Sequence, residues 1–397
     1  MDLHILLNIF IIFGIAILII MICNFLKSPY IIGYLITGII LSPNTTGLLK
    51  DTHTVEMYAE IGVILLLFTV GLEFSFSNLK KIKRYVLMGG PVQVLSTIFI
   101  TATLIWLITR PSLEESFFWG FLYALSSTAI VIKTLQDHNK INTPHGKFIL
   151  AVLLFQDIII VPLMLLTPIL AGEGGNPVYD LLLLLGKLIL MGAFSYLLAR
   201  FVIPRFLHQV RKIQSQEVFL IATIFIVIGV ALLTSSLGLS LALGAFIAGL
   251  IIAETDYNRL AISCFLPFRY VFISFFFISM GMLLDYKVFI THFHLILFWF
   301  FFTMIVKAVA GIIAAKTLKL SWKTAIAAGF SIAQIGEFSF VLAQSGLKYQ
   351  LISDINYQIF LAVSILLMSV TPFIVNNAEK IQPGFAQLRL KKKKSDE

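Results

Sequence analysis

The sequence predicts an all-α membrane protein that crosses the bilayer many times. Of its 397 residues, 59% are hydrophobic, 12% are charged and 36 are phenylalanines. Soluble domains carry about 25% charged residues. At about 20 residues for each crossing, the chain has room for roughly a dozen spans and for no sizeable soluble domain. The two cysteines, Cys23 and Cys264, lie in or beside apolar runs, which favours packing over a disulfide or a metal site.

A window of spanning length predicts thirteen candidate spans. The first has no basic start and no small-residue cleavage site, so we expect a span there and not a signal peptide. The eighth and ninth are separated at "SSLGLS", because the uncharged run 218–253 is too long for one crossing. The predicted spans lie near 3–26, 29–42, 57–76, 85–109, 116–136, 147–171, 178–203, 217–235, 240–255, 265–284, 290–317, 323–346 and 353–376.

The basic residues predict the orientation, because Lys and Arg are retained on the cytoplasmic side. With the N terminus outside and the C terminus in the cytoplasm, all but six of the 29 Lys and Arg residues lie on the cytoplasmic side. The net charge of +9 therefore describes a membrane topology and not a nucleic-acid partner. Residues 377–397 form a predicted short basic tail on anionic lipid; a specific lipid or protein contact is the alternative. The six exceptions are Lys50, Arg110, Lys287 and Lys348 outside, with Lys187 and Lys307 inside spans.

Polar intramembrane residues cluster in the fifth and sixth spans and again in the eleventh and twelfth. This spacing is what two inverted-topology repeats joined by a linker span would give. We therefore expect residues 1–376 to form one transmembrane domain. Its polar core helices are expected near 85–171 and 290–376. The family resemblance described below implies that these helices bind the ion and that the helices around them serve as scaffold and dimerisation helices.

Asp157, in "LLFQDIIIVPLML", is the leading candidate for an ion-binding residue. A carboxylate at a helix centre costs about 3 kcal/mol, so it is usually kept where it faces a water-filled cavity or binds something. Pro162 removes the hydrogen bond to the Ile158 carbonyl, which gives a hard-oxygen environment suited to an alkali cation. Gln156 points about 100° away around the helix. It either joins the site through a distorted backbone or braces a neighbouring helix.

Ser126, Ser127 and Thr128, in "LSSTA", place three hydroxyls in an apolar span. Such hydroxyls often bond to their own helix and help helices pack. They also occur where an interrupted helix lines an ion site. With Asp157 in the next span, we favour the interrupted helix, and we predict that these oxygens contribute to a cation and proton site.

In "SIAQIGEFSF", Gln334 and Glu337 are three residues apart, which predicts a shared helix face, with Gly336 giving flexibility or close approach. Lys307 stands alone in "FFFTMIVKAVAGIIAA" and requires a counter-charge if buried. We favour a structural pair of Lys307 with Glu337, which leaves Asp157 free to titrate. Glu337 as a second ion or proton carrier remains open.

Five stretches carry a family resemblance. "GVILLLFTVGLEFS", "ALSSTAIVIKTL", "LLFQDIIIVPLM", "LALGAFIAGLIIAET" and "QIGEFSFVLAQSG", in this order, resemble the membrane domain of the monovalent cation:proton antiporter-2 family, closest to its Kef-type potassium/proton branch. The resemblance covers about residues 9–376. It implies a thirteen-helix Na⁺/H⁺ antiporter-like fold, crossing broken helices at the fifth and twelfth spans, and a homodimer with an elevator-like motion. It also implies that Asp157 carries cation and proton in turn, in a bacterial plasma membrane.

Two departures from the family qualify this expectation. Many sodium-transporting relatives carry adjacent aspartates where this chain has Gln156 and Asp157. The single carboxylate favours K⁺ over Na⁺ and electroneutral exchange. Kef-type proteins also carry a cytosolic nucleotide-binding domain after the last helix, and only about twenty residues follow Asn376 here. Either the chain is a naturally short member or it is a truncated form of a longer protein, so gating by nucleotides or glutathione is not assumed. A separate regulatory subunit is an open expectation.

The predicted activity is exchange of a monovalent cation for H⁺, with K⁺ favoured, Na⁺ as the alternative cation and no cofactor. The runner-up is a gated passive K⁺ channel on the same fold, which the absence of a ring-forming filter motif disfavours. The sequence has no HExxH, no phosphate-binding Gly loop and no Ser with a plausible His partner, so we do not expect an enzyme.

Overall fold

The computed structural model describes residues 3–26, 28–43, 45–49, 52–73, 83–172, 182, 186, 190, 192–236 and 241–378. Across these residues the secondary structure is helical, without a strand, which confirms the predicted fold class. The helices are α1 (Leu3–Phe25), α2 (Tyr30–Leu41), α3 (Thr52–Glu73), the π-helical turn η1 (Tyr85–Gly89), α5 (Gly90–Thr109), α6 (Leu113–Ala124), α7 (Thr128–Asp137), α8 (Pro144–Leu170), the π-helical turn η2 (Leu198–Val202), α10 (Ile203–Lys212), α11 (Gln216–Ser236), α12 (Leu241–Ala253), α13 (Asn258–Met282), α14 (Tyr286–Thr291), α15 (Phe293–Thr317), α16 (Trp322–Ser331), α17 (Glu337–Lys348) and α18 (Asp354–Asn377).

The helices follow the predicted spans in three ways. Within the described part of the chain, seven helical segments are long and apolar enough to cross a bilayer, and three shorter apolar helices match the second, third and ninth predicted spans. The fifth and twelfth predicted spans each contain two helices with a break between them. The seventh predicted span, 178–203, falls largely outside the described residues, as does the tail from 379 onward. The count of thirteen therefore stays a prediction.

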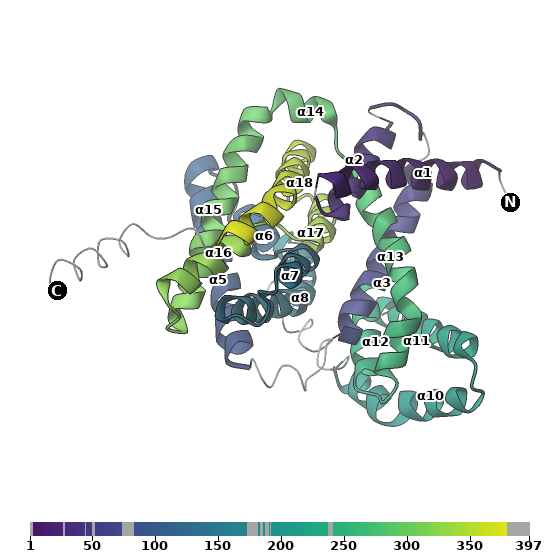
Figure 1. The fold of residues 1–397 in the computed structure, drawn as a ribbon. Helices are drawn as coiled ribbons and strands as arrows, with labels where there is room; N and C mark the ends of the chain where they lie inside the picture. The colour runs from purple at the N-terminus through teal and green to yellow at the C-terminus, as the bar shows by residue number, and fades with distance from the viewer. Residues whose placement is uncertain are drawn as a thin grey trace. The chain divides into compact units, whose positions relative to one another are not determined.

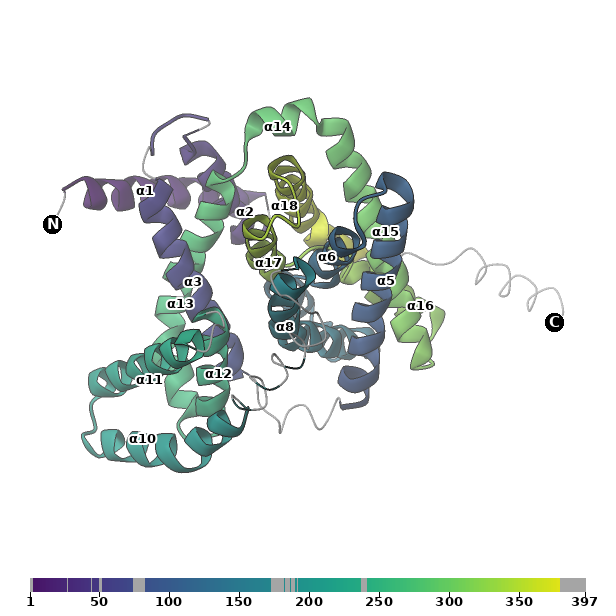
Figure 2. The same ribbon diagram turned by 180° about the vertical axis from the view of Figure 1, so that it is seen from behind.

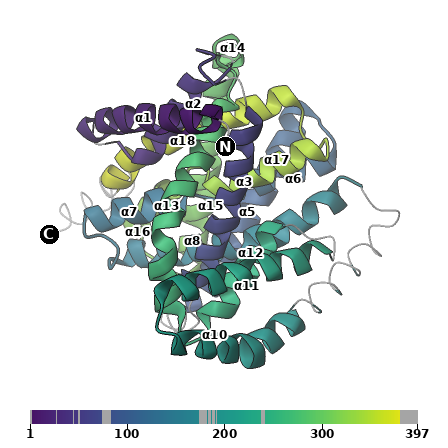
Figure 3. The same cartoon turned by 90° about the vertical axis from the view of Figure 1, so that its right-hand side faces the viewer.

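The chain divides into two compact units. Unit 1 contains residues 1–21, 33–78 and 172–283. Within it, α3 packs along both α12 and α13 (Figure 1), and α10 and α11 form a hairpin beside α12 (Figure 3). The close approach of α3 to α12 depends on glycines, because a Cβ on Gly71 would lie 2.9 Å from the Cα of Gly249. Small residues of this kind let membrane helices pack closely without a hydrophobic driving force.

Unit 2 contains residues 22–32, 79–171 and 284–397. Within this unit α5 packs against α6 and α15, and α15 also packs against α16 and α18 (Figure 2). Several of its helices begin at capping residues, as α6 does at Ser112, whose hydroxyl accepts from the Glu115 N–H at 3.0 Å. α8 continues through Pro162 and Pro168. Both broken helices belong to this unit.

Candidate cation site at two helix breaks

The first break lies in the fifth predicted span. α6 ends at Ala124 and α7 begins at Thr128, with extended backbone at Leu125 and Ser127. The Ser127 hydroxyl accepts a hydrogen bond from the Ile130 N–H at 3.3 Å, so this serine caps the N terminus of α7. The helix interruption predicted at "LSSTA" is confirmed, while the contribution of its oxygens to an ion site stays a prediction.

The second break lies in the twelfth predicted span. α16 ends at Ser331 and α17 begins at Glu337, its first helical residue. The prediction that Gln334 and Glu337 share one helix face is therefore wrong. The spacing of three assumed a continuous helix, whereas Gln334 lies in the break and only Glu337 lies on the helix.

The two breaks hydrogen-bond to each other. The Ser126 hydroxyl donates to the Ile332 carbonyl at 2.8 Å, and the Ser127 N–H donates to Oε1 of Gln334 at 2.9 Å. All three polar side chains are buried. Two backbone segments about 200 residues apart thus satisfy each other's polar groups, which is required where irregular backbone lies at membrane depth.

Gly336 allows this contact. Its N–H donates to the Leu125 carbonyl at 3.1 Å, and a Cβ at this position would lie 2.6 Å from the carbonyl oxygen of Ser126. Its backbone is extended with negative φ, so the glycine is required for close approach and not for an unusual conformation.

Asp157 lies on α8 next to the first break and is 4% exposed. The Thr128 hydroxyl donates to its carboxylate, at 2.9 Å to Oδ1 and 3.1 Å to Oδ2. Because Thr128 is the first residue of α7, the carboxylate lies at the positive end of that helix, where an anion is stabilised. The structure thus brings together two of the predicted site residues, Asp157 and Thr128.

Gln156 contacts the break and a neighbouring helix. Its Oε1 accepts from the Ser126 N–H at 2.7 Å, and its amide nitrogen donates to Oε1 of Gln93 on α5 at 2.7 Å. Gln93 in turn donates to Thr97 at 3.0 Å. These contacts match the second of the two alternatives for Gln156, which is that it braces a neighbouring helix. Gln93 was not singled out from the sequence, although a glutamine in the apolar run "GPVQVLSTIFI" is a signal that could have identified it.

Lys307 on α15 is fully buried. Its ammonium donates to the carbonyl of Tyr123 and, at 2.9 Å, to that of Leu125. These carbonyls belong to the C-terminal end of α6, where a helix carries partial negative charge and unpaired acceptors. Glu337 begins α17, at a positive helix end. The hydrogen bonds described for Lys307 thus go to backbone oxygens, and its predicted pair with Glu337 stays a prediction.

The chemistry offered near Asp157 is that of hard oxygens. Among the described residues there is no group of three or more His, Cys, Asp and Glu side chains that could hold a metal ion. Carboxylate, hydroxyl and carbonyl oxygens lie at the breaks instead, and such ligands suit hard cations.

Comparison with known proteins identifies the family. Residues 11–377 match the family described as "Sodium/hydrogen exchanger, transmembrane". The chain belongs to this family. Its relatives place it in the Kef-type branch of the monovalent cation:proton antiporters.

Three relatives indicate the range of similarity. "Glutathione-regulated potassium-efflux system protein KefC" of Cronobacter sakazakii is 32% identical, over 94% of this chain and 60% of that protein. "K(+) efflux antiporter 1, chloroplastic" of Arabidopsis thaliana is 31% identical, over 90% of this chain and 30% of that protein. "Putative cation/proton antiporter YbaL" of Escherichia coli K12 is 30% identical, over 91% of this chain and 66% of that protein. The chain therefore spans about one third to two thirds of these relatives.

The fold matches a solved structure. The sodium proton antiporter MjNhaP1 from Methanocaldococcus jannaschii superposes with a TM-score of 0.66 over 93% of this chain and 97% of that one, at 16% identity. This likeness concerns the fold, and it agrees with the Na⁺/H⁺ antiporter-like architecture predicted from the sequence.

Proposed function

We propose that this protein exchanges a monovalent cation for H⁺ across a membrane, with K⁺ as the favoured cation. The observation that carries the proposal is Asp157, a buried carboxylate held by Thr128 at the point where two broken helices meet. Relatives named as K⁺ efflux antiporters and as a cation/proton antiporter support it.

The mechanism is competition for one carboxylate. Either a partly dehydrated cation or a proton neutralises Asp157, and the empty, charged site crosses the membrane barrier poorly because a bare carboxylate there is costly. Each ligand removes the same charge, so exchange is electroneutral. Thr128 directs its hydroxyl at the carboxylate, while Ser126, Ser127, Gln156 and Gln334 fix the breaks around it.

Unit 2 is the body that moves in this mechanism. It contains Asp157, both broken helices and Lys307, all tied by hydrogen bonds within the unit. We assign to unit 1 the scaffold and the homodimer interface. Elevator-type transport needs such a division, because the site must change its access without losing its internal contacts.

The cellular setting follows the bacterial relatives. We place the protein in the bacterial plasma membrane with its N terminus outside, its C terminus in the cytoplasm and its basic tail on anionic lipid. One relative carries glutathione regulation in its name. We propose that a separate regulatory subunit controls this chain.

Proton movement in proteoliposomes tests the function. A pH gradient is imposed, and K⁺, Na⁺, Li⁺ or choline is added outside. We expect K⁺ to dissipate the gradient most strongly and choline not at all, without dependence on membrane potential. Asp157→Asn should abolish the signal and leave the protein folded. Asp137→Asn is the matched control, because Asp137 is an exposed acid near the end of α7, 3.8 Å from Lys133.

The outcomes separate the alternatives. Robust exchange by Asp157→Asn would refute the site. Cation flux that does not saturate and does not drive protons backward would favour the passive K⁺ channel on the same fold.

A further inference from the structure

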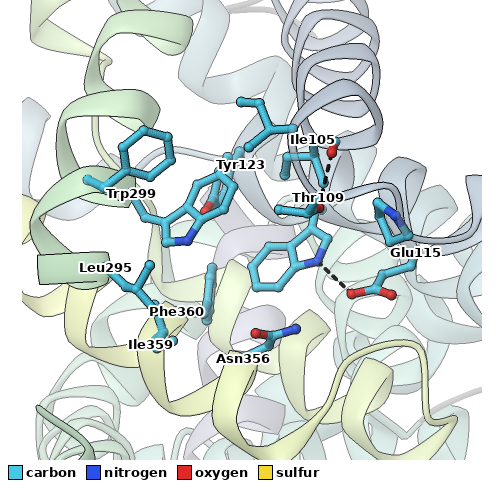
Figure 4. Close-up of a pocket in the computed structure, with 13 residues that line it drawn as sticks. Ile105, Thr109, Glu115, Tyr123, Leu295, Trp299, Asn356, Ile359 and Phe360 are labelled. Atoms are coloured by element: carbon cyan, nitrogen blue, oxygen red, sulfur yellow. Dashed lines mark hydrogen bonds between the residues drawn. The ribbon is translucent and has the colours of Figure 1, made fainter. Parts of the chain in front are cut away.

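A cavity in unit 2 is lined by none of the residues of the two helix breaks. It has a volume of about 390 Å³ and is lined by residues of α5, α6, α15 and α18 (Figure 4). This volume is within the range of small-molecule sites, about 300–1,000 Å³.

The cavity has a polar end and an aromatic end. Its polar side chains come from residues near helix ends. They are Thr109 at the end of α5, Glu115 in the first turn of α6 and Asn356 in the first turn of α18. One to two turns deeper, Tyr123 and Phe360 line it. A ligand that follows this gradient has a polar head at the membrane interface and an apolar body.

The charge of the polar end selects the head group. Glu115 is the acidic residue among those that line the cavity, and the described lining includes no basic side chain. Its Oε1 accepts from the indole N–H of Trp119 at 3.3 Å, which fixes the carboxylate beside that ring. An anionic head group would be repelled, whereas a cation would be attracted.

Three aromatic rings strengthen this preference. The ring centroid of Trp119 lies 5.7 Å from that of Tyr123 and 6.1 Å from that of Phe360. The rings of Trp119 and Tyr123 pack edge to face, so the three rings form one aromatic cluster. Aromatic faces attract organic cations within about 6 Å of the ring centroid. Glu115, Trp119 and Tyr123 are spaced by four residues and so share one face of α6.

We propose that this cavity binds an organic ammonium ion with an apolar body, and that binding slows exchange. The ammonium lies beside the Glu115 carboxylate at the polar end, and the body packs against Tyr123 and Phe360. The link to the cation site is Tyr123, since its side chain lines the cavity and its carbonyl accepts from Lys307. An occupant therefore holds the last turn of α6, directly before the first break. The effect on exchange rests on the proposed function, whereas the binding itself does not.

Binding is tested on the purified chain in detergent by equilibrium dialysis of labelled phenyltrimethylammonium against protein-free micelles. We expect the labelled ion to bind saturably. Uncharged tert-butylbenzene has the same shape, and we expect it to displace the labelled ion only at a concentration at least about tenfold higher than the unlabelled ion requires. Glu115→Gln keeps the side-chain shape and an acceptor for Trp119, and it should weaken binding about tenfold. Glu114→Gln is the matched control, because Glu114 is an exposed acid in the same helical turn and does not line the cavity.

Exchange in proteoliposomes gives the second readout. Phenyltrimethylammonium should lower the maximal rate in the native protein and in Glu114→Gln, without raising the half-saturating K⁺ concentration. In Glu115→Gln the same inhibition should require about ten times more of the ion. Absence of saturable binding, equal displacement by tert-butylbenzene, or unchanged affinity of Glu115→Gln would overturn the site. Binding without any change in the maximal rate would overturn its control of exchange. Charge-dependent binding by a protein that exchanges no cation would leave the site standing and refute the proposed function instead.

Discussion

Replacing Thr128 with valine should shift the pH profile of the exchange rate. Its acid limb, the range in which exchange slows as the pH falls, should move to higher pH. The Thr128 hydroxyl donates to both carboxylate oxygens of Asp157, at 2.9 and 3.1 Å, and this stabilises the ionised acid. Valine has the same branched shape and no donor, so the charged form loses this stabilisation while the neutral form loses little. A proton then competes better against the cation.

The magnitude follows from the geometry. A hydrogen bond to a charged group contributes about 1.5–3 kcal/mol. One pH unit corresponds to about 1.36 kcal/mol, so the range is about one to two units. The hydroxyl shares one proton between two oxygens, which favours the lower value. We therefore expect the half-maximal point of the acid limb to rise by about one pH unit.

The assay is K⁺-driven proton movement in proteoliposomes at closely spaced pH values, and the control is Thr134→Val. Thr134 lies on the same helix, is buried, and donates its hydroxyl to the Ile130 carbonyl at 2.7 Å. It has the same chemistry without contact to Asp157. An acid limb of Thr128→Val that coincides with those of the native protein and the control would refute the role of the hydroxyl.

The sequence predicted the parts of the site that depend on local chemistry. Hydroxyls in "LSSTA" predicted the break that the structure shows. An isolated acid five residues before Pro162 singled out Asp157, which lies next to that break, and its role in binding stays a prediction. The shared face of Gln334 and Glu337 was wrong because helical periodicity holds only while the helix continues. The partners of Lys307 could not be predicted, since backbone carbonyls carry no signal in the sequence.

In the proposed mechanism, charges at the helix ends account for the assignment of Asp157 as the group that changes its ligand. Each break exposes a negative carbonyl end and a positive N–H end inside the membrane. Lys307 lies at the carbonyl end of α6, and Glu337 begins α17. Asp157 lies at the positive end of α7, where either a proton or a cation can neutralise it.

Two further predictions concern the contacts that hold the breaks. Gly336→Ala would place a Cβ 2.6 Å from the Ser126 carbonyl oxygen, so we expect about 1–3 kcal/mol lower stability and impaired exchange. Gly229→Ala, with no atom within 4 Å, is the matched control and should melt no lower than the native protein. Gln93→Leu leaves the amide N–H of Gln156 without the acceptor that it has at 2.7 Å, and an unmade buried hydrogen bond costs about 1–3 kcal/mol. Thermal unfolding in detergent should show this loss of stability. Exchange should also slow, because the Gln156 amide that accepts from the Ser126 N–H is no longer fixed. A native melting temperature together with a native rate would contradict the bracing role.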